Sequence, residues 1–225
     1  MSHGPVLTVG VPPTLAVNWL IPRLTQFYRL HPKIEVRMAT AGMTRPVRDD
    51  WTCTIRRDVG SLSGYLADEL FPSALVPVCA PSLAAVLHTP ADLRKATLIL
   101  VSHLPDDWPL WFEAAGLAKP IRSAAEVSFD SNAMAMQAAH DGVGVAIAQP
   151  LYITDALASG RLVAPFPIVA MKPETWALQY RSSYDGDPAL IAFREWLLSE
   201  ANKQRDIESK LIGPKRNMAV RKRHK

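Results

Sequence analysis

The stretch Val6-Leu7-Thr8-Val9-Gly10-Val11 is a nearly continuous apolar run that stops at Pro12-Pro13. A run of this kind is typical of a parallel strand covered on both faces. Apolar side chains then recur at helical spacing over residues 20–31, which predicts an amphipathic helix. We expect this helix to begin near Asn18, because Pro22 is tolerated in a first turn, where it forfeits no internal hydrogen bond.

A second strand is predicted over residues 34–38, where apolar residues alternate with charged ones. Strand, helix and strand with short connections form a βαβ unit, whose crossover is right-handed in nearly all cases. The chain is therefore predicted to belong to the α/β class.

The same order of elements returns further along the chain. Residues 98–101 predict a strand, and residues 109–115 predict a helix that ends at Gly116. A strand closing at Phe129, a helix over 133–140 and a buried strand over 143–148 follow. A single lobe would not need this pattern twice, so a second α/β lobe is predicted. The last predicted helix covers residues 188–200.

Charge is distributed unevenly along the 225 residues, whose formal net charge is +4. Residues 202–225 carry nine Lys/Arg and two acidic residues, so the rest of the chain is mildly acidic. We expect this basic tail to be disordered and solvated, because it has no apolar periodicity. A contact of the tail with DNA or another acidic surface is the alternative.

No apolar run approaches the roughly 20 residues that a membrane span needs, and the first residues lack the pattern of a signal peptide. We therefore expect a cytoplasmic protein without membrane contact. Cys53 and Cys79 are expected to be reduced and buried as small apolar residues.

Catalytic and metal-binding patterns are not found in the sequence. The six histidines are scattered, without a pair at metal-ligand spacing. Gly142-Val143-Gly144 lies after a helix and before a strand, the reverse of the order in a dinucleotide-binding loop. We expect a protein that is not an enzyme, with no catalytic residue, no cofactor and no metal.

Several blocks of sequence, taken in order, resemble the effector-binding domain of LysR-type transcriptional regulators. These blocks are 7–14, 19–24, 31–37, 53–56 with Gly60, 75–83, and 129–132 running into 138–148. The resemblance covers about residues 5 to 200, and ordered blocks are far more specific than one short motif. The chain looks most similar to the subgroup that contains the β-lactamase-gene activator and the glycine-cleavage activator.

This resemblance implies a type-II periplasmic-binding-protein-like fold, in which two Rossmann-like lobes are joined by two crossover strands. Lobe I would comprise residues 5–77 and 176–201, and lobe II residues 78–175. The crossings are expected near 76–78 and 175–180. A small effector would bind in the cleft between the lobes. Helix starts facing the cleft would favour a polar or anionic effector.

The implied function is that of a sensor domain that controls transcription. The implied partners are a small-molecule effector, a second copy in a homodimer or homotetramer, and DNA only through an N-terminal winged helix-turn-helix, which is absent from this chain. The alternative is a solute-binding protein of the same fold that serves a transporter, which would need an export signal. An enzyme of this fold would need a catalytic constellation.

Residues at strand ends and on the crossing strands are the candidates for effector binding. They are Pro12, Pro13, Thr14, Thr40, Arg56, Ser131, Asn132 and Thr175.

Most of these candidates also have a purely structural interpretation, and Pro12 and Pro13 are expected to shape the loop. Thr14 and the pair Ser131-Asn132 could cap helices, since Ser, Thr and Asn are common there whatever the function. Thr40 could be a surface turn residue. Arg56 could bind a carboxylate of the effector, or it could be a surface arginine paired with Asp58 or Asp68.

The tryptophans have structural interpretations as well. Trp176, on the return crossing, is expected to pack at the hinge, and Trp108 and Trp111 are expected to be buried.

Overall fold

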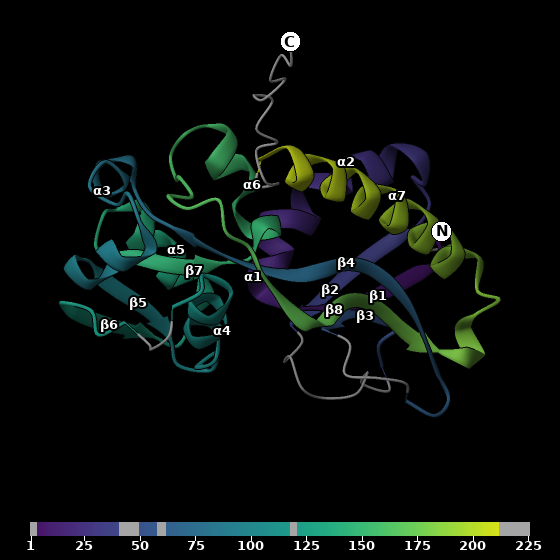
Figure 1. Ribbon diagram of the computed structural model, residues 1–225. Helices are drawn as coiled ribbons and strands as arrows, with labels where there is room; N and C mark the ends of the chain where they lie inside the picture. The colour runs from purple at the N-terminus through teal and green to yellow at the C-terminus, as the bar shows by residue number, and fades with distance from the viewer. Residues whose placement is uncertain (1–3, 41–49, 58–61, 118–120, 212–225) are drawn as a thin grey trace, which may run out of the picture.

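The computed structural model describes residues 4–40, 50–57, 62–117 and 121–211. Within these residues, eight strands form one mixed sheet in the order β2-β1-β3-β8-β4-β7-β5-β6 (Figure 1). The strands are β1 (Val6–Val11), β2 (Glu35–Thr40), β3 (Cys53–Arg57), β4 (Tyr65–Val78), β5 (Thr97–Val101), β6 (Ala125–Phe129), β7 (Val145–Ala148) and β8 (Ala170–Arg181). The α/β class is confirmed.

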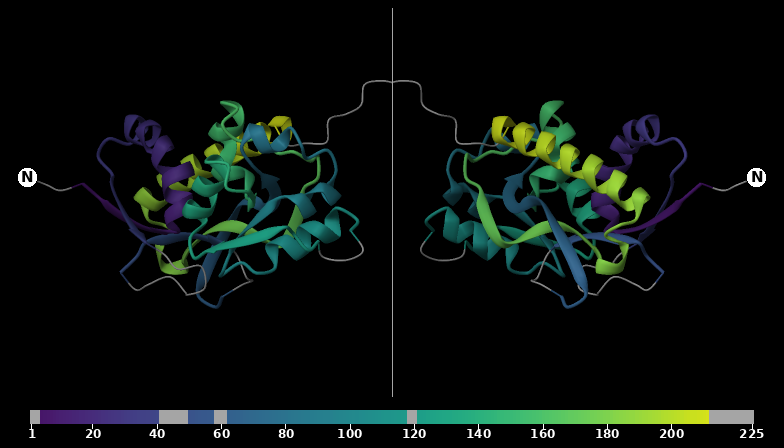
Figure 2. Two further views of the ribbon diagram at one scale, coloured as in Figure 1. Left: turned by 90° about the vertical axis from the view of Figure 1, so that its left-hand side faces the viewer. Right: turned by 90° about the vertical axis from the view of Figure 1, so that its right-hand side faces the viewer.

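Helices cover both parts of this sheet. They are α1 (Pro13–Leu15), the π-helical turn η1 (Ala16–Leu20), α2 (Ile21–Leu30), α3 (Pro81–Ala84), the 3₁₀ helix η2 (Pro90–Lys95), α4 (Asp107–Ala114), α5 (Asn132–His140), α6 (Pro150–Ala158), the 3₁₀ turn η3 (Ser182–Tyr184) and α7 (Pro188–Leu211). α2 and α7 lie on the same side of the strands β1, β3 and β4 (Figures 1 and 2).

The sheet consists of two halves that share the long strands β4 and β8. In the first half-sheet, β1 is parallel to β2 and β3, and β8 is antiparallel to β3. In the second half-sheet, β5 is parallel to β6 and β7, and β7 is antiparallel to the end of β4. β4 and β8 pair with each other and run from one half to the other.

Each half-sheet has its own apolar core. The core of the first half packs Trp19 and Phe27 against Trp176 and the α7 residue Phe193. The second half-sheet is covered on both faces by apolar groups, with Trp111 among those on the α4 side. Separate cores are what two α/β units joined by two strands require.

The crossings lie a few residues away from the predicted positions. Residues 76–78 already pair with β7 in the second half, and residues 176–180 already pair with β3 in the first half. The strands cross between these segments, at 72–75 and 170–175, where the pairing shifts register. Pro72 offers no backbone N–H to the ladder, which favours irregular pairing there. The resemblance alone could not locate this break in pairing.

The first helix begins at Pro13, so the predicted start near Asn18 is wrong. Pro12 is the residue before the first turn and Pro13 occupies its first position, where a proline forfeits nothing. The helix continues through η1 into α2, with the Ile21 N–H donating to the Ala16 carbonyl in a π-type bond. Pro22 is therefore internal, and the widened turn just before it accommodates the missing N–H.

Helix α7 runs to Leu211, so the predicted disorder is wrong for residues 202–211. The buried face continues from Leu197 through Ala201 to Gln204, and all three are fully buried. The spacing of Leu197, Ala201 and Gln204 continues the helical pattern. The sequence nevertheless favours a solvated position for Gln204, because its side chain is polar. The remainder of the predicted tail, 212–225, lies outside the described residues.

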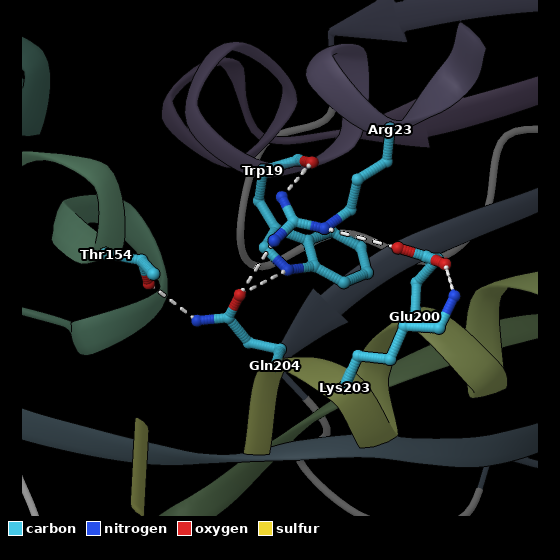
Figure 3. A network of polar contacts seen from close by, with 6 residues as sticks. All are labelled: Trp19, Arg23, Thr154, Glu200, Lys203 and Gln204. Carbon is cyan, nitrogen blue, oxygen red and sulfur yellow. Dashed lines mark hydrogen bonds and ion pairs between the residues drawn. The ribbon is translucent and has the colours of Figure 1, made fainter. Parts of the chain in front are cut away.

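Gln204 is buried because its amide is satisfied by side chains from three other helical segments (Figure 3). Its Oε1 accepts hydrogen bonds from Trp19 Nε1 at 3.1 Å and from Arg23 Nη2 at 2.9 Å, and its Nε2 donates to Thr154 Oγ1 at 2.7 Å. Arg23 also lies 3.6 Å from Glu200. Burial lowers the pKa of the Arg23 guanidinium, and Glu200 opposes this shift. The network fixes the helix that follows β1.

We predict that Gln204→Ala lowers the free energy of unfolding by about 1–3 kcal/mol, because buried partners lose their hydrogen bonds. Urea denaturation measures the change. Asn202→Ala, two residues earlier and exposed, is the control and is expected to change it by less than about 0.5 kcal/mol. Equal effects of the two substitutions would show that the network does not stabilise the fold.

Candidate functional site

The first group of candidate residues lies at one edge of the first half-sheet. β1 and β2 are parallel, and Val11 is opposite Thr40 at their carboxyl ends. Pro12, Pro13 and Thr14 follow directly on β1. The ends of parallel strands meet at the same edge of a sheet, which is where α/β proteins bind ligands. Thr40 is exposed, and residues 41–49, which follow it, lie outside the described residues.

Gly10 has no side chain, which lets the Trp51 ring pack directly on β1 just before this edge. A Cβ atom at Gly10 would come within 2.3 Å of ring carbons of Trp51. The next strand is tied to the same place, because Thr54 Oγ1 donates to the Gly10 carbonyl at 3.0 Å. A larger residue at position 10 would displace Trp51 from the end of β1.

Thr14 does not cap its helix. It is the second helical residue, and Pro12 is the capping residue. The Thr14 carbonyl accepts a hydrogen bond from Asn18 Nδ2 at 2.9 Å. Its half-buried hydroxyl forms no hydrogen bond with any residue that the structure describes. The hydroxyl is thus available to a ligand.

Ser131 and Asn132 begin α5, at the end of β6. Ser131 is the residue before the first turn, with extended backbone (φ −129°, ψ 129°), yet its side chain makes no capping hydrogen bond. Its carbonyl accepts the Ala135 N–H at 3.1 Å. Within the described part of the chain, the half-buried side chains of Ser131 and Asn132 have no hydrogen-bond partner. The capping interpretation therefore fails for the hydroxyl of Ser131.

The carboxyl ends of strands in the second half-sheet face the first half. α6 begins directly after β7 and contacts α1 and η1. Gln149, between β7 and α6, accepts a hydrogen bond from Trp176 Nε1 at 2.6 Å. β5 and β6 run parallel to β7, so the start of α5 lies at this same edge. The structure thus places the two groups of candidates on the facing ends of the two half-sheets.

Thr175 and Arg56 lie between these groups. Thr175 is half-buried in the crossing part of β8, opposite Pro72. Arg56 lies near the end of β3, opposite Ala177, and is only 6% exposed, so it is not the surface arginine of the structural interpretation. Asp68, one partner considered for it, forms its ion pair with Arg194 at 2.6 Å. The other, Asp58, lies outside the described residues.

The tryptophan predictions are confirmed. Trp176 is fully buried and packs where the two halves join, and Trp108 and Trp111 are buried as well. No pattern in the sequence marks Gln149 and Gln204, which accept hydrogen bonds from Trp176 and Trp19. A glutamine in a helix or loop is expected to be exposed to solvent unless its hydrogen-bond partners are known.

The cysteines are buried and unpaired, as predicted. Burial raises the pKa of the Cys79 thiol to about 11 and raises that of Cys53 as well. Neither is a thiolate near neutral pH, so neither is an activated nucleophile. In residues 4–40, 50–57, 62–117 and 121–211, no three His, Cys, Asp or Glu side chains are grouped to hold a metal ion. No helix in these ranges has the length and apolar character to cross a bilayer.

A two-part α/β sheet with polar side chains on facing strand ends is an architecture suited to binding a small ligand. The family described as the LysR substrate binding domain matches residues 2–202, and the chain belongs to this family. The recognised resemblance and the type-II periplasmic-binding-protein-like fold are thereby confirmed.

Transcriptional activators are among the similar proteins. The activator AmpR of Pseudomonas aeruginosa is 38% identical over 197 residues, which are 87% of this chain and 66% of that protein. The glycine cleavage system transcriptional activator of Escherichia coli is 34% identical over 199 residues, which are 87% of this chain and 65% of that protein. The chain thus spans about two thirds of the length of these relatives.

A solved structure supports the same conclusion. The effector domain of Pseudomonas aeruginosa AmpR has a TM-score of 0.76 and 36% identity, covering 91% of this chain and 98% of that one. These relatives are regulators and not enzymes, which confirms the expectation of a non-catalytic domain. The comparisons give no support to the solute-binding alternative.

We predict that Thr14→Val and Ser131→Ala each change the free energy of unfolding by less than about 0.5 kcal/mol, because neither hydroxyl is bonded within the described residues. Thr54→Val is the matched comparison. Its hydroxyl is buried and bonded to Gly10, so we expect a loss of about 1–3 kcal/mol. Thermal and urea denaturation measure all three. A large loss for Thr14→Val would show that this hydroxyl has a structural role.

Proposed function

We propose that this domain binds a small polar or anionic effector in a cleft between two lobes, and that binding controls transcription. The observation that carries the proposal is a set of polar side chains, on the facing strand ends and on the crossing strand between them, without hydrogen-bond partners among the described residues: Thr14, Thr40, Ser131, Asn132 and Thr175. All of these except the exposed Thr40 are half-buried, and half-buried polar groups without partners are costly unless a ligand or water binds them.

The proposed lobes are residues 5–77 with 176–201, and residues 78–175. The separate apolar cores support this division, since the first core draws on both ends of the chain. α6 is the exception, because its Leu151 packs into the first core.

Helix starts contribute to ligand choice in this proposal. α5 and the continuous helix that begins at Pro13 start at the facing edges, and their free N–H groups favour negative charge. The buried guanidinium of Arg56 adds positive charge near the same edge. An effector with an anionic group at this place is therefore favoured, with Pro12 and Pro13 shaping the loop around it.

Binding would act by shifting the population of lobe arrangements, because a ligand stabilises the arrangement that it contacts best. The irregular pairing of β4 and β8 near Pro72 supports a hinge there. We propose that the domain works in the cytoplasm, and that DNA is bound by a winged helix-turn-helix outside this sequence.

We predict that a panel of amino acids and cell-wall fragments contains a compound that raises the melting temperature of this domain. A ligand present at 100 times its Kd stabilises the folded state by about 2.7 kcal/mol. Thr14→Val and Asn132→Ala should reduce this shift without changing the melting temperature of the free domain. If both variants retain the full shift, the cleft is not the binding site.

We also propose that the domain forms a homodimer or homotetramer, in which the first helix of one copy packs against the second lobe of its partner. Several large apolar side chains on this helix support the proposal, since they are exposed to solvent. They are Val17 at 63%, Ile21 at 44%, Tyr28 at 39% and Leu30 at 60% exposure. Contiguous exposed apolar surface marks an interaction site more often than isolated residues do.

We predict that Val17→Glu weakens self-association by about tenfold or more, since it places a charge in an apolar interface. Sedimentation velocity at increasing concentration measures the change. Ile191→Glu is the control, because Ile191 is 37% exposed and lies in α7, outside both the first helix and the second lobe. A wild-type domain that sediments only as a monomer at high concentration contradicts the proposal.

A further inference from the structure

A cavity of about 180 Å³ lies in the second half of the molecule, and none of the candidate effector-binding residues lines it. It is enclosed by the carboxyl ends of the second half-sheet, the loop after β5 and the first turn of α4. Leu100, Leu104 and Trp108 are among the apolar lining residues. An apolar cavity of about 150 Å³ is large enough to bind benzene. This cavity therefore has room for a small ring or a branched alkyl group.

The inner wall of the cavity is formed by buried apolar side chains. Trp108 is buried, and its Nε1 donates to the Ile99 carbonyl at 3.0 Å. The indole N–H is thus engaged, and the ring presents only apolar surface. Ile147, also buried, lines the cavity from β7.

One charged residue, Asp107, is among the lining residues, and it belongs to a buried ion pair. Lys172 Nζ lies 2.6 Å from Asp107 Oδ1, and the two side chains are only 8% and 10% exposed. Burying two charges is costly, so such a pair is weak evidence for stability alone. Among the described residues, no group donates to the second oxygen, Asp107 Oδ2.

Two serine hydroxyls stand at the exposed side of the cavity. Ser102 and Ser128 both line it and are exposed to solvent. Neither hydroxyl is hydrogen-bonded to another residue in the part of the chain that the structure describes. The Ser102 N–H donates to the Phe129 carbonyl at 2.8 Å, two residues before Ser131. The cavity thus borders the edge that carries Ser131 and Asn132.

We infer that this cavity is a specificity pocket of the proposed effector site, and that it takes an apolar arm of the effector that carries a hydroxyl or amine. The inference rests on the proposed function. The apolar inner wall accepts the arm, and Asp107 and the two serines can accept hydrogen bonds from its hydroxyl or amine. A carboxylate fits this pocket poorly, because the unbonded Asp107 Oδ2 can only accept hydrogen bonds and a carboxylate has none to donate. The effector would then carry its anionic group at the helix starts and its uncharged or cationic arm in this pocket.

Three probes of similar size test the pocket without knowledge of the effector: benzyl alcohol, benzylamine and benzoate. The indole N–H resonance of Trp108, assigned by its loss in Trp108→Phe, reports binding by NMR titration of the ¹⁵N-labelled chain. We expect benzyl alcohol and benzylamine to shift this resonance with millimolar affinity, as their size allows. Benzoate should bind about tenfold or more weakly. Equal binding of all three, or no shift of Trp108, overturns the inference.

Two substitutions test whether the probes bind in the cavity. Ser128→Phe fills the exposed side of the cavity and should weaken benzyl alcohol about tenfold or more. Ser123→Phe is the matched control, because Ser123 precedes the same strand but does not line the cavity. It should leave binding unchanged. Equal effects of the two variants would place the probes elsewhere.

The double variant Asp107→Asn with Lys172→Met removes both charges, so neither remains buried alone. It should abolish the preference for benzylamine over benzoate while benzyl alcohol still binds. A preference that persists would exclude Asp107 as its cause.

The two proposals can fail separately. A compound panel without any stabiliser contradicts the cleft, whereas probes that bind equally well to Ser128→Phe contradict the pocket. When a stabiliser is found, Ser128→Phe should lower its affinity and Ser123→Phe should not. Full affinity in Ser128→Phe would show that the effector does not use the cavity.

Discussion

The antiparallel pairing of β4 with β8 is the constraint on which the rest of the molecule depends. Tyr65 pairs with Arg181 at one end of this ladder, and Leu75 pairs with Ala170 at the other. One end of the ladder is extended by β3 and the other by β7. Each half-sheet is therefore built outward from the same two strands. Facing strand ends, and with them the candidate site, follow from this arrangement.

Much of this architecture could be predicted from local sequence patterns. The apolar run before Pro12 and the alternation after Pro32 gave the first βαβ unit, and Gly116 and Gly142 marked helix ends that do adopt positive φ. The predictions were wrong where contacts between distant residues determine the ends of a helix. A proline pair set the first helix start in place of Asn18, and Gln204 extended α7 because Trp19, Arg23 and Thr154 satisfy its amide.

The candidate site, too, could be predicted from the sequence only in part. Strand-end residues such as Thr14 and Ser131 could be found from sequence, because element order alone fixes which loops meet at an edge. The sequence could not show that their side chains make no capping hydrogen bonds, because this depends on the backbone geometry at the helix start. The buried pair of Asp107 and Lys172 was also missed, because its members are 65 residues apart.

The double crossing also has a consequence for how the chain is made. The second core is supplied by one uninterrupted stretch between Leu75 and Ala170, so it can close as soon as that stretch has left the ribosome. The first core joins residues of β1 to Trp176, Phe193 and Leu197, which are synthesised after that stretch. Strand β1 is therefore translated before the second core but gains its full set of neighbours after it. During that interval its apolar run depends on α2 and β2 for cover, and this strand is the part of the domain most exposed to aggregation during synthesis.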